Sequence, residues 1–239
     1  MKLKHRLPSY SVIEDLSLNE NQLLGLVNCI HELESEFKSV LEVNKELCGI
    51  HHDLASKVYE NFFQISLTDS TVENKLITLE ECELVDEEIH SKGLIKSYRK
   101  RIELTTSDSS PMNESTYTTK TKIYDSYAEI FDSIFSKIKG KSTRARLVKL
   151  NAGSNVTPHI DYDPSYATRI VIPIIADNEC LNVFWVKNKI ETVAFIPGKA
   201  YFLNTGYKHA VMNFSKHDRY TLLISIYGTE DINHLLKEI

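Results

Sequence analysis

The residues best suited to chemistry are two histidines and one aspartate in the second half of the chain. His159 and Asp161 are separated by one residue, so on an extended strand both side chains point to the same face. His209 lies much later in the sequence and would complete a set of two imidazoles and one carboxylate. Such a set leaves coordination positions open and is typical of Fe(II) sites in oxygenases.

An arginine follows these residues at a distance that lets the chain turn and return on a neighbouring strand. Arg219 comes after His209 and a polar turn at Ser215–Asp218. Its guanidinium would then face the same pocket and hold a carboxylate through two parallel hydrogen bonds.

A histidine and an aspartate two positions apart are common, and a single histidine on a strand is usually a surface residue or a hydrogen-bonded core residue. Here the pair is followed by a predicted hairpin, a Pro197–Gly198 turn, His209 and Arg219. The order of these features favours a metal site over isolated polar residues.

The elements that must position these residues begin near Thr143. Short runs of β-branched and aromatic residues alternate with turn residues, which indicates a jelly-roll core over residues 143–228. The predicted strands are Arg146–Leu150, Arg169–Ile175, Asn182–Val186, Thr192–Ile196, Ala200–Leu203, Ala210–Phe214 and Tyr220–Tyr227.

Residues 1–142 are predicted to be mainly helical and to pack on this core, which gives an α+β fold in a single domain over residues 1–239. Apolar residues at spacings of three and four predict a helix that starts at Ser17–Glu20 and reaches Val40. Further expected elements are a helix at Leu54–Phe63, a strand at Gly93–Thr105, a polar loop at 106–121 that acts as a lid, a helix at Tyr124–Ile138 and a C-terminal helix within 229–239.

Composition excludes several classes of protein. The 239 residues carry 28 Lys and Arg against 33 Asp and Glu, so the net charge of −5 gives no support to nucleic-acid binding. The apolar runs are too short to cross a membrane, and the N-terminus has no apolar core of a secretory signal. The four cysteines have no paired spacing, so we expect reduced thiols in a cytoplasmic protein.

The segment Arg146–Tyr227 resembles the catalytic core of the Fe(II)- and 2-oxoglutarate-dependent oxygenases. It is similar in particular to the aspartyl/asparaginyl β-hydroxylase and cis-proline 3-hydroxylase group. The matching motifs are Leu150–Gly153, Pro158–Asp161, Arg169–Ile174, Gly198–Asn204, His209–Asn213 and Asp218–Arg219.

This resemblance implies that His159, Asp161 and His209 hold Fe(II) and that Arg219 binds the distal carboxylate of 2-oxoglutarate. It implies that Arg169 faces the cosubstrate or the substrate. Asn204, Asn213 and Tyr201 lie on strands that the family turns toward the pocket, where they either bind the cosubstrate or satisfy core polar groups. Fe(II), 2-oxoglutarate and O₂ are the implied cofactors and cosubstrates, with ascorbate as a stimulant.

The implied reaction is the hydroxylation of an unactivated C–H bond, with succinate and CO₂ as co-products. A small amino-acid-like substrate is favoured over a residue in a peptide, and Arg169, Arg144 and Arg146 are the candidates to bind its carboxylate. The segment 106–121 or 153–157 would close over it. A metal-binding cupin-like module without oxygenase activity is the alternative from another class, and the oligomeric state stays open.

Overall fold

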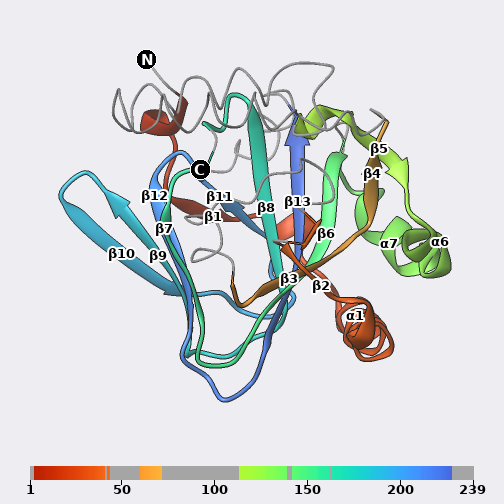
Figure 1. Ribbon diagram of the computed structural model, residues 1–239. Helices are drawn as coiled ribbons and strands as arrows, with labels where there is room; N and C mark the ends of the chain where they lie inside the picture. Colours follow the sequence, from red (N-terminus) through yellow and green to blue (C-terminus); the bar gives the residue numbers. More distant parts are fainter. Residues whose placement is uncertain are drawn as a thin grey trace, which may run out of the picture.

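Figure 1 shows the computed structural model of the chain, in which two β-sheets form the core and helices lie beside the larger sheet. The structure describes residues 3–40, 42–43, 60–71, 113–138, 142–161 and 163–227. The strands are β1 (Tyr10–Val12), β2 (Lys38–Ser39), β3 (Phe62–Ser66), β4 (Thr68–Ser70), β5 (Tyr117–Lys120), β6 (Ser142–Leu150), β7 (Asn155–His159), β8 (Ala167–Ile175), β9 (Cys180–Val186), β10 (Lys189–Ala194), β11 (Tyr201–Leu203), β12 (Lys208–Asn213) and β13 (Arg219–Tyr227). The helices are α1 (Glu20–Glu32), α6 (Lys122–Ser126) and α7 (Ala128–Phe135), with short 3₁₀ turns η1 (Leu3–Arg6), η2 (Glu14–Leu16), η3 (Glu34–Glu36) and η4 (Glu114–Thr116).

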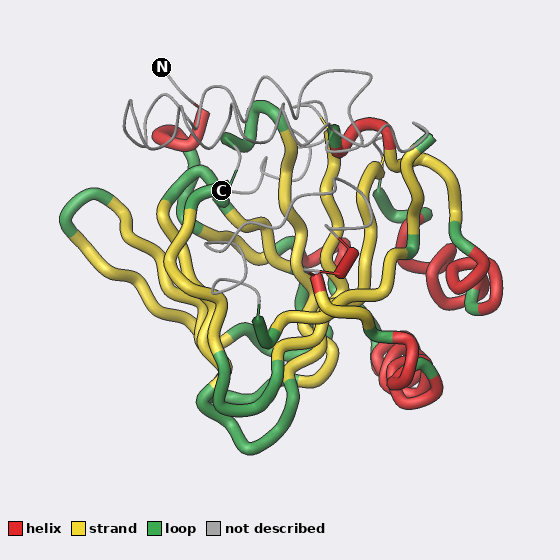
Figure 2. The backbone as a smooth tube through the Cα atoms, viewed as in Figure 1, coloured by secondary structure: helices red, strands yellow, loops and turns green. Residues whose placement is uncertain are grey.

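The core is built from one large and one small antiparallel sheet, as expected for a jelly roll. The strand order is β1-β11-β8-β13-β6-β3-β2 in the large sheet and β10-β9-β12-β7 in the small one, and β4 and β5 form a separate pair. Figure 2 shows the turns gathered at the strand ends, with the β9–β10 hairpin extending away from the helices. The predicted α+β class with a jelly-roll core is confirmed.

The two faces of the large sheet have different partners, because successive side chains of a strand point to opposite faces. Ile170, Ile172 and Ile174 of β8 lie in the main hydrophobic core, whereas Arg169 and Val171 line a pocket on the other face. The same alternation holds for the central strands β6 and β13. The large sheet therefore carries its core on one face and its pocket on the other.

Helices α1 and α7 cover the core face of the large sheet (Figure 1). Helix α1 begins at a capping box, in which the Asn19 side chain accepts from the Gln22 backbone N–H and the Gln22 side chain accepts from the Asn19 N–H. Gln22 also donates to Ser133 of α7 and so ties the two helices together. Leu26, Ile30 and the α7 residue Phe131 are buried where these helices meet the sheet.

The first helix is shorter than its apolar repeat predicts. It begins after Asn19 as expected but ends at Glu32, and the chain then forms η3 and the short strand β2. Val40, the last residue of the predicted helix, is buried and lines the pocket instead. A repeat of apolar residues records burial, and successive elements that are buried on different sides of the large sheet produce it as well as one helix does.

Two further expectations for the first half are corrected where the structure describes the residues. The segment Glu114–Lys120, predicted as loop, forms η4 and β5, because Thr and Tyr residues suit a strand and β5 finds a partner in β4. Phe62 and Phe63, predicted as the end of a helix, begin strand β3. Residues 54–59, 93–105, 106–112 and 229–239 lie outside the described residues, so the elements expected there stay predictions.

The strands of the second half lie close to their predicted positions, and one strand was missed. β7 covers Asn155–His159. Its first three residues, 155–157, were expected to belong to a segment that closes over the substrate rather than to a strand. The predicted helix at 124–138 is present as α6 and α7, which are separated at Tyr127. Among the described residues, the structure contains no helix long and apolar enough to cross a membrane.

Candidate active site

The small sheet brings the two histidines together. β7 and β12 pair antiparallel with His159 directly opposite His209, and the centroids of the two rings are 4.3 Å apart. β7 ends at His159, so Asp161 lies just beyond the strand rather than on it as expected. Its backbone N–H donates to the Thr205 carbonyl at 3.0 Å, which holds the aspartate next to the histidines without strand pairing.

The three side chains present a ring of acceptor atoms with no hydrogen bond between them. Nε2 of His159 lies 3.7 Å from Asp161 Oδ1, and Nε2 of His209 lies 3.9 Å from Asp161 Oδ2. One ligand atom of each residue lies within 4.8 Å of the others. Two imidazoles and a carboxylate at this separation are the donors of a facial metal site.

The backbone fixes which nitrogen of each ring faces inward. Nδ1 of His159 lies 2.7 Å from the Thr157 carbonyl, and Nδ1 of His209 lies 3.0 Å from the Tyr207 carbonyl. A carbonyl accepts only, so each Nδ1 donates a hydrogen bond and each Nε2 is left as the nitrogen that faces the site. Burial lowers the pKa of His209 to about 4, so this ring is neutral near pH 7. Converging ring nitrogens and a carboxylate fit a cation between them.

Arg169 and Glu114 form the next layer around Asp161. Nη2 of Arg169 lies 3.8 Å from Asp161 Oδ2 and 3.4 Å from Glu114 Oε1, and its Nη1 donates to Ser225 at 2.9 Å. Burial would raise the pKa of Glu114, but the charges of the surrounding arginines hold it below its usual value. Arg169 is therefore engaged by carboxylates of the protein, and it restrains Asp161 at the site.

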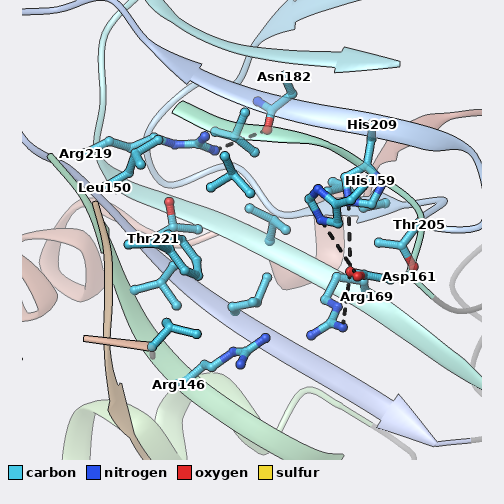
Figure 3. Close-up of a pocket in the computed structure, with 18 of the residues that line it drawn as sticks. Arg146, Leu150, His159, Asp161, Arg169, Asn182, Thr205, His209, Arg219 and Thr221 are labelled. Atoms are coloured by element: carbon cyan, nitrogen blue, oxygen red, sulfur yellow. Dashed lines mark hydrogen bonds and ion pairs between the residues drawn. The ribbon is translucent and has the colours of Figure 1, made fainter. Parts of the chain in front are cut away.

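The triad opens into a cavity of about 190 Å³ between the two sheets. Figure 3 shows Arg219 and Arg146 in different parts of this pocket, with the triad and Arg169 together in a third. Arg219 begins β13 and is 5% exposed, and its Nη2 donates to Asn182 Oδ1 at 3.3 Å. Its buried Nε has no hydrogen-bond partner in the described part of the chain, and burial lowers the pKa of the guanidinium to about 10.

The structure brings seven of the predicted site residues into this pocket and leaves three outside it. The seven are Arg144, Arg146, His159, Asp161, Arg169, His209 and Arg219. Tyr201 lies outside the pocket, and its hydroxyl accepts a hydrogen bond from the backbone N–H of Ile196. Asn204 and Asn213, expected either to bind the cosubstrate or to satisfy core polar groups, do not line the pocket.

The side chains of both asparagines donate hydrogen bonds to backbone carbonyls. Asn213 is fully buried, and its Nδ2 donates to the carbonyls of Leu150, Asn151 and His217. Asn204 donates to the carbonyls of Leu7 and Pro8, ahead of β1. Both amides therefore act in the fold, at the ends of strands where backbone carbonyls lack ladder partners.

Four polar residues that line the pocket were not foreseen: Glu114, Asn182, Thr205 and Thr221. Asn182 occupies a strand position between apolar neighbours, and that interruption of an apolar run was a usable signal. Thr205 follows β11, and its role in the site, which is to hold the backbone of Asp161, is visible only from the hydrogen bond between them. Glu114 lies in a segment rich in Ser, Thr and Asn, where nothing in the sequence marks one carboxylate as buried.

A family model described as aspartyl/asparaginyl beta-hydroxylase matches residues 87–228, which is more than half of the chain and includes all three triad residues and Arg219. The chain belongs to the aspartyl/asparaginyl beta-hydroxylase family. The chain is thus an enzyme of the Fe(II)- and 2-oxoglutarate-dependent oxygenase class, as the sequence motifs indicated. No curated protein matches its sequence.

Several solved structures are similar to this chain at low sequence identity. A prolyl hydroxylase in complex with a hypoxia inducible factor peptide, from Trichoplax adhaerens, is 9% identical with a TM-score of 0.53, covering 99% of this chain and 90% of that one. A 2OG-Fe(II) oxygenase family protein from Burkholderia pseudomallei is 13% identical with a TM-score of 0.45, covering 93% and 85%. A prolyl-4-hydroxylase from Pseudomonas putida is 10% identical with a TM-score of 0.45, covering 92% of each chain.

Proposed function

We propose that this protein hydroxylates an unactivated C–H bond of a free amino acid or amino-acid derivative, with His159, Asp161 and His209 as the ligands of Fe(II). The observation that carries the proposal is the convergence of the two histidine rings and the Asp161 carboxylate, whose ligand atoms lie within 4.8 Å of one another, with each Nδ1 turned to a backbone carbonyl. When bound, Fe(II) and 2-oxoglutarate supply the oxidising chemistry, with O₂ consumed and succinate and CO₂ released.

Arg219 is the residue proposed to hold the distal carboxylate of 2-oxoglutarate. Its guanidinium is buried, and its only hydrogen bond to a described residue is to the neutral amide of Asn182. A buried cation is costly unless an anion pairs with it, so this arginine is suited to a carboxylate that enters the pocket. A metal-binding module without oxygenase activity has no need of such a residue.

The remaining pocket residues orient these groups and exclude water. Arg169 restrains the Asp161 carboxylate from one side, and the Thr205 carbonyl fixes its backbone from the other. Val156, Leu203 and Val211 form apolar walls around the triad. A low-dielectric lining of this kind strengthens the charge interactions inside it.

The size of the cavity supports a small substrate. Its volume of about 190 Å³ lies below the roughly 300–1,000 Å³ of pockets that hold drug-sized ligands. A residue within a peptide is the alternative, and it agrees with the peptide bound to the Trichoplax adhaerens prolyl hydroxylase of similar fold.

Substrate-dependent CO₂ release from 2-oxoglutarate separates the two substrate classes. The Fe(II)-loaded protein is incubated with each proteinogenic amino acid, and separately with a pool of peptides blocked at both ends. We expect release above the substrate-free rate with at least one free amino acid and none with the blocked peptides. Turnover with the peptides alone would replace the small-molecule proposal with a peptidyl one. The same assay with a chelator present gives the background.

A further inference from the structure

The charges that line the pocket do not balance among the described residues. Four arginines and two carboxylates line it, so the lining carries a surplus of two positive charges. Fe(II) and 2-oxoglutarate carry charges of opposite sign and equal size, so loading the site leaves the surplus unchanged. Uncompensated charge on buried side chains is unfavourable, so this lining favours the binding of a further anion. The four arginines are Arg144, Arg146, Arg169 and Arg219.

Two of these arginines already face a carboxylate of the protein. Arg169 lies beside both Glu114 and Asp161. Nη1 of Arg144 lies 3.8 Å from Glu114 Oε1, and its guanidinium lies over the ring of Tyr117 at 5.0 Å. These two arginines therefore share the charge of Glu114 and are fixed in the wall of the pocket.

The other two arginines are held by neutral amides. Nη1 of Arg146 donates to Oε1 of Gln64 at 3.0 Å, just as Arg219 donates to Asn182. Among the described residues, no carboxylate lies within 4 Å of either guanidinium, and the Nε of each is buried without a partner. Burial and the nearby charges of Arg144 and Arg169 lower the pKa of Arg146 to about 9. An amide fixes the direction of a guanidinium without neutralising it.

The strand register places the two amide-held arginines at different levels of the large sheet. On β13, Arg219 pairs with Leu150 and Leu223 pairs with Arg146. Four residues of strand separate these two positions, which is about 13 Å of backbone at the usual rise. Figure 3 shows the two guanidinium groups in separate parts of the pocket, with the triad to one side of both. Each therefore serves a different anion.

We propose that Arg146 is the receptor for a carboxylate of the substrate, so that the enzyme selects a small free acid over the corresponding amide or an internal peptide residue. The inference rests on the proposed function, in which Arg219 is occupied by 2-oxoglutarate. Gln64 directs the Arg146 guanidinium, and Arg144 adds a second positive charge beside it. The carboxylate of the substrate offsets one of the two surplus positive charges, the one on Arg146.

Binding of matched acids and amides to the loaded protein tests this inference. The full-length protein is loaded with Mn(II), which replaces Fe(II) and prevents turnover, and with 2-oxoglutarate. The probes are the proteinogenic amino acids and small mono- and dicarboxylic acids, each with its carboxamide, and calorimetry measures their dissociation constants. We expect at least one acid to bind about tenfold or more tightly than its amide, because a buried charge pair adds at least that much.

Three variants distinguish recognition of the substrate by Arg146 from a purely structural role of this residue. Arg146→Gln is expected to remove the preference for the acid while leaving the affinity for 2-oxoglutarate unchanged. Arg146→Lys retains the charge in a smaller head group, so we expect this variant to keep a weaker preference for the acid over its amide. It provides the test if the glutamine variant does not fold. Lys149→Gln is the matched control, because Lys149 lies on the same strand but contacts Glu34 and Asp218 instead of the pocket.

The outcomes separate this inference from the proposed function. If the wild type binds 2-oxoglutarate but no acid in preference to its amide, Arg146 is structural and the inference is wrong, while the oxygenase site stands. Retention of the full acid preference in Arg146→Gln contradicts the inference in the same way. Failure of the metal-loaded wild type to bind 2-oxoglutarate overturns the proposed function itself.

Discussion

Replacing His209 with alanine is expected to yield a folded protein that no longer retains Fe(II). His209 supplies one of three ligand atoms, and its Nδ1 is already committed to the Tyr207 carbonyl. Loss of a partner that only supports a ligand lowers metal affinity by about 10–100-fold, so loss of the ligand itself should exceed about a hundredfold. Metal analysis after dialysis measures the iron that remains bound.

The control for this variant is His217→Ala. His217 is exposed in the turn before β13, and its backbone carbonyl, which Asn213 binds, is unchanged by the substitution. This control should retain iron at the level of the wild type, and both variants should unfold cooperatively on heating. Stoichiometric iron in the His209 variant would remove this residue from the ligand set.

Replacing Arg219 with alanine is expected to weaken the binding of 2-oxoglutarate without changing the iron content. Removing one partner of a buried, hydrogen-bonded charge pair costs about 2–5 kcal/mol, which corresponds to roughly 30- to several-thousand-fold in the dissociation constant. Arg219 begins a strand of the large sheet, whereas His159 and His209 lie on the small sheet and Asp161 just beyond it, so the ligand atoms should keep their positions. Titration of the Fe(II)-loaded protein with 2-oxoglutarate under anaerobic conditions gives the constant.

Arg219→Lys refines this result, because lysine keeps the charge but presents no planar pair of donors. It should bind 2-oxoglutarate with an affinity between those of the wild type and the alanine variant. If the alanine variant and the wild type gave the same titration curve, the cosubstrate would be held by another arginine, and Arg146 would be the first to test.

The sequence alone predicted most of the strands, because alternating or continuous apolar runs between turn residues have few other interpretations. It also predicted the convergence of His159, Asp161 and His209 through side-chain parity and the resemblance to a known family. The family match over residues 87–228 confirms that resemblance. The geometry of Asp161 was foreseen only in part, since a backbone bond to Thr205 rather than strand pairing holds it.

The parts that sequence reasoning missed depend on contacts between distant segments. Glu114 is a carboxylate in a polar segment, and only its burial against Arg144 and Arg169 makes it part of the site. The pairing of Arg146 with Gln64 joins β6 to β3, a strand whose first two residues were predicted to end a helix. The orientation of Asn213 depends on three backbone carbonyls that no local pattern reveals.

Formation of succinate from 2-oxoglutarate, with and without Fe(II), is the most direct test of this account. The purified protein is supplied with ascorbate and the panel of free amino acids, and succinate is quantified over time. We predict succinate formation that requires Fe(II) and is lost in the His209→Ala variant. Absence of iron-dependent succinate, together with absence of 2-oxoglutarate binding to the iron-loaded protein, would contradict an oxygenase site and favour a metal-binding module without oxygenase activity.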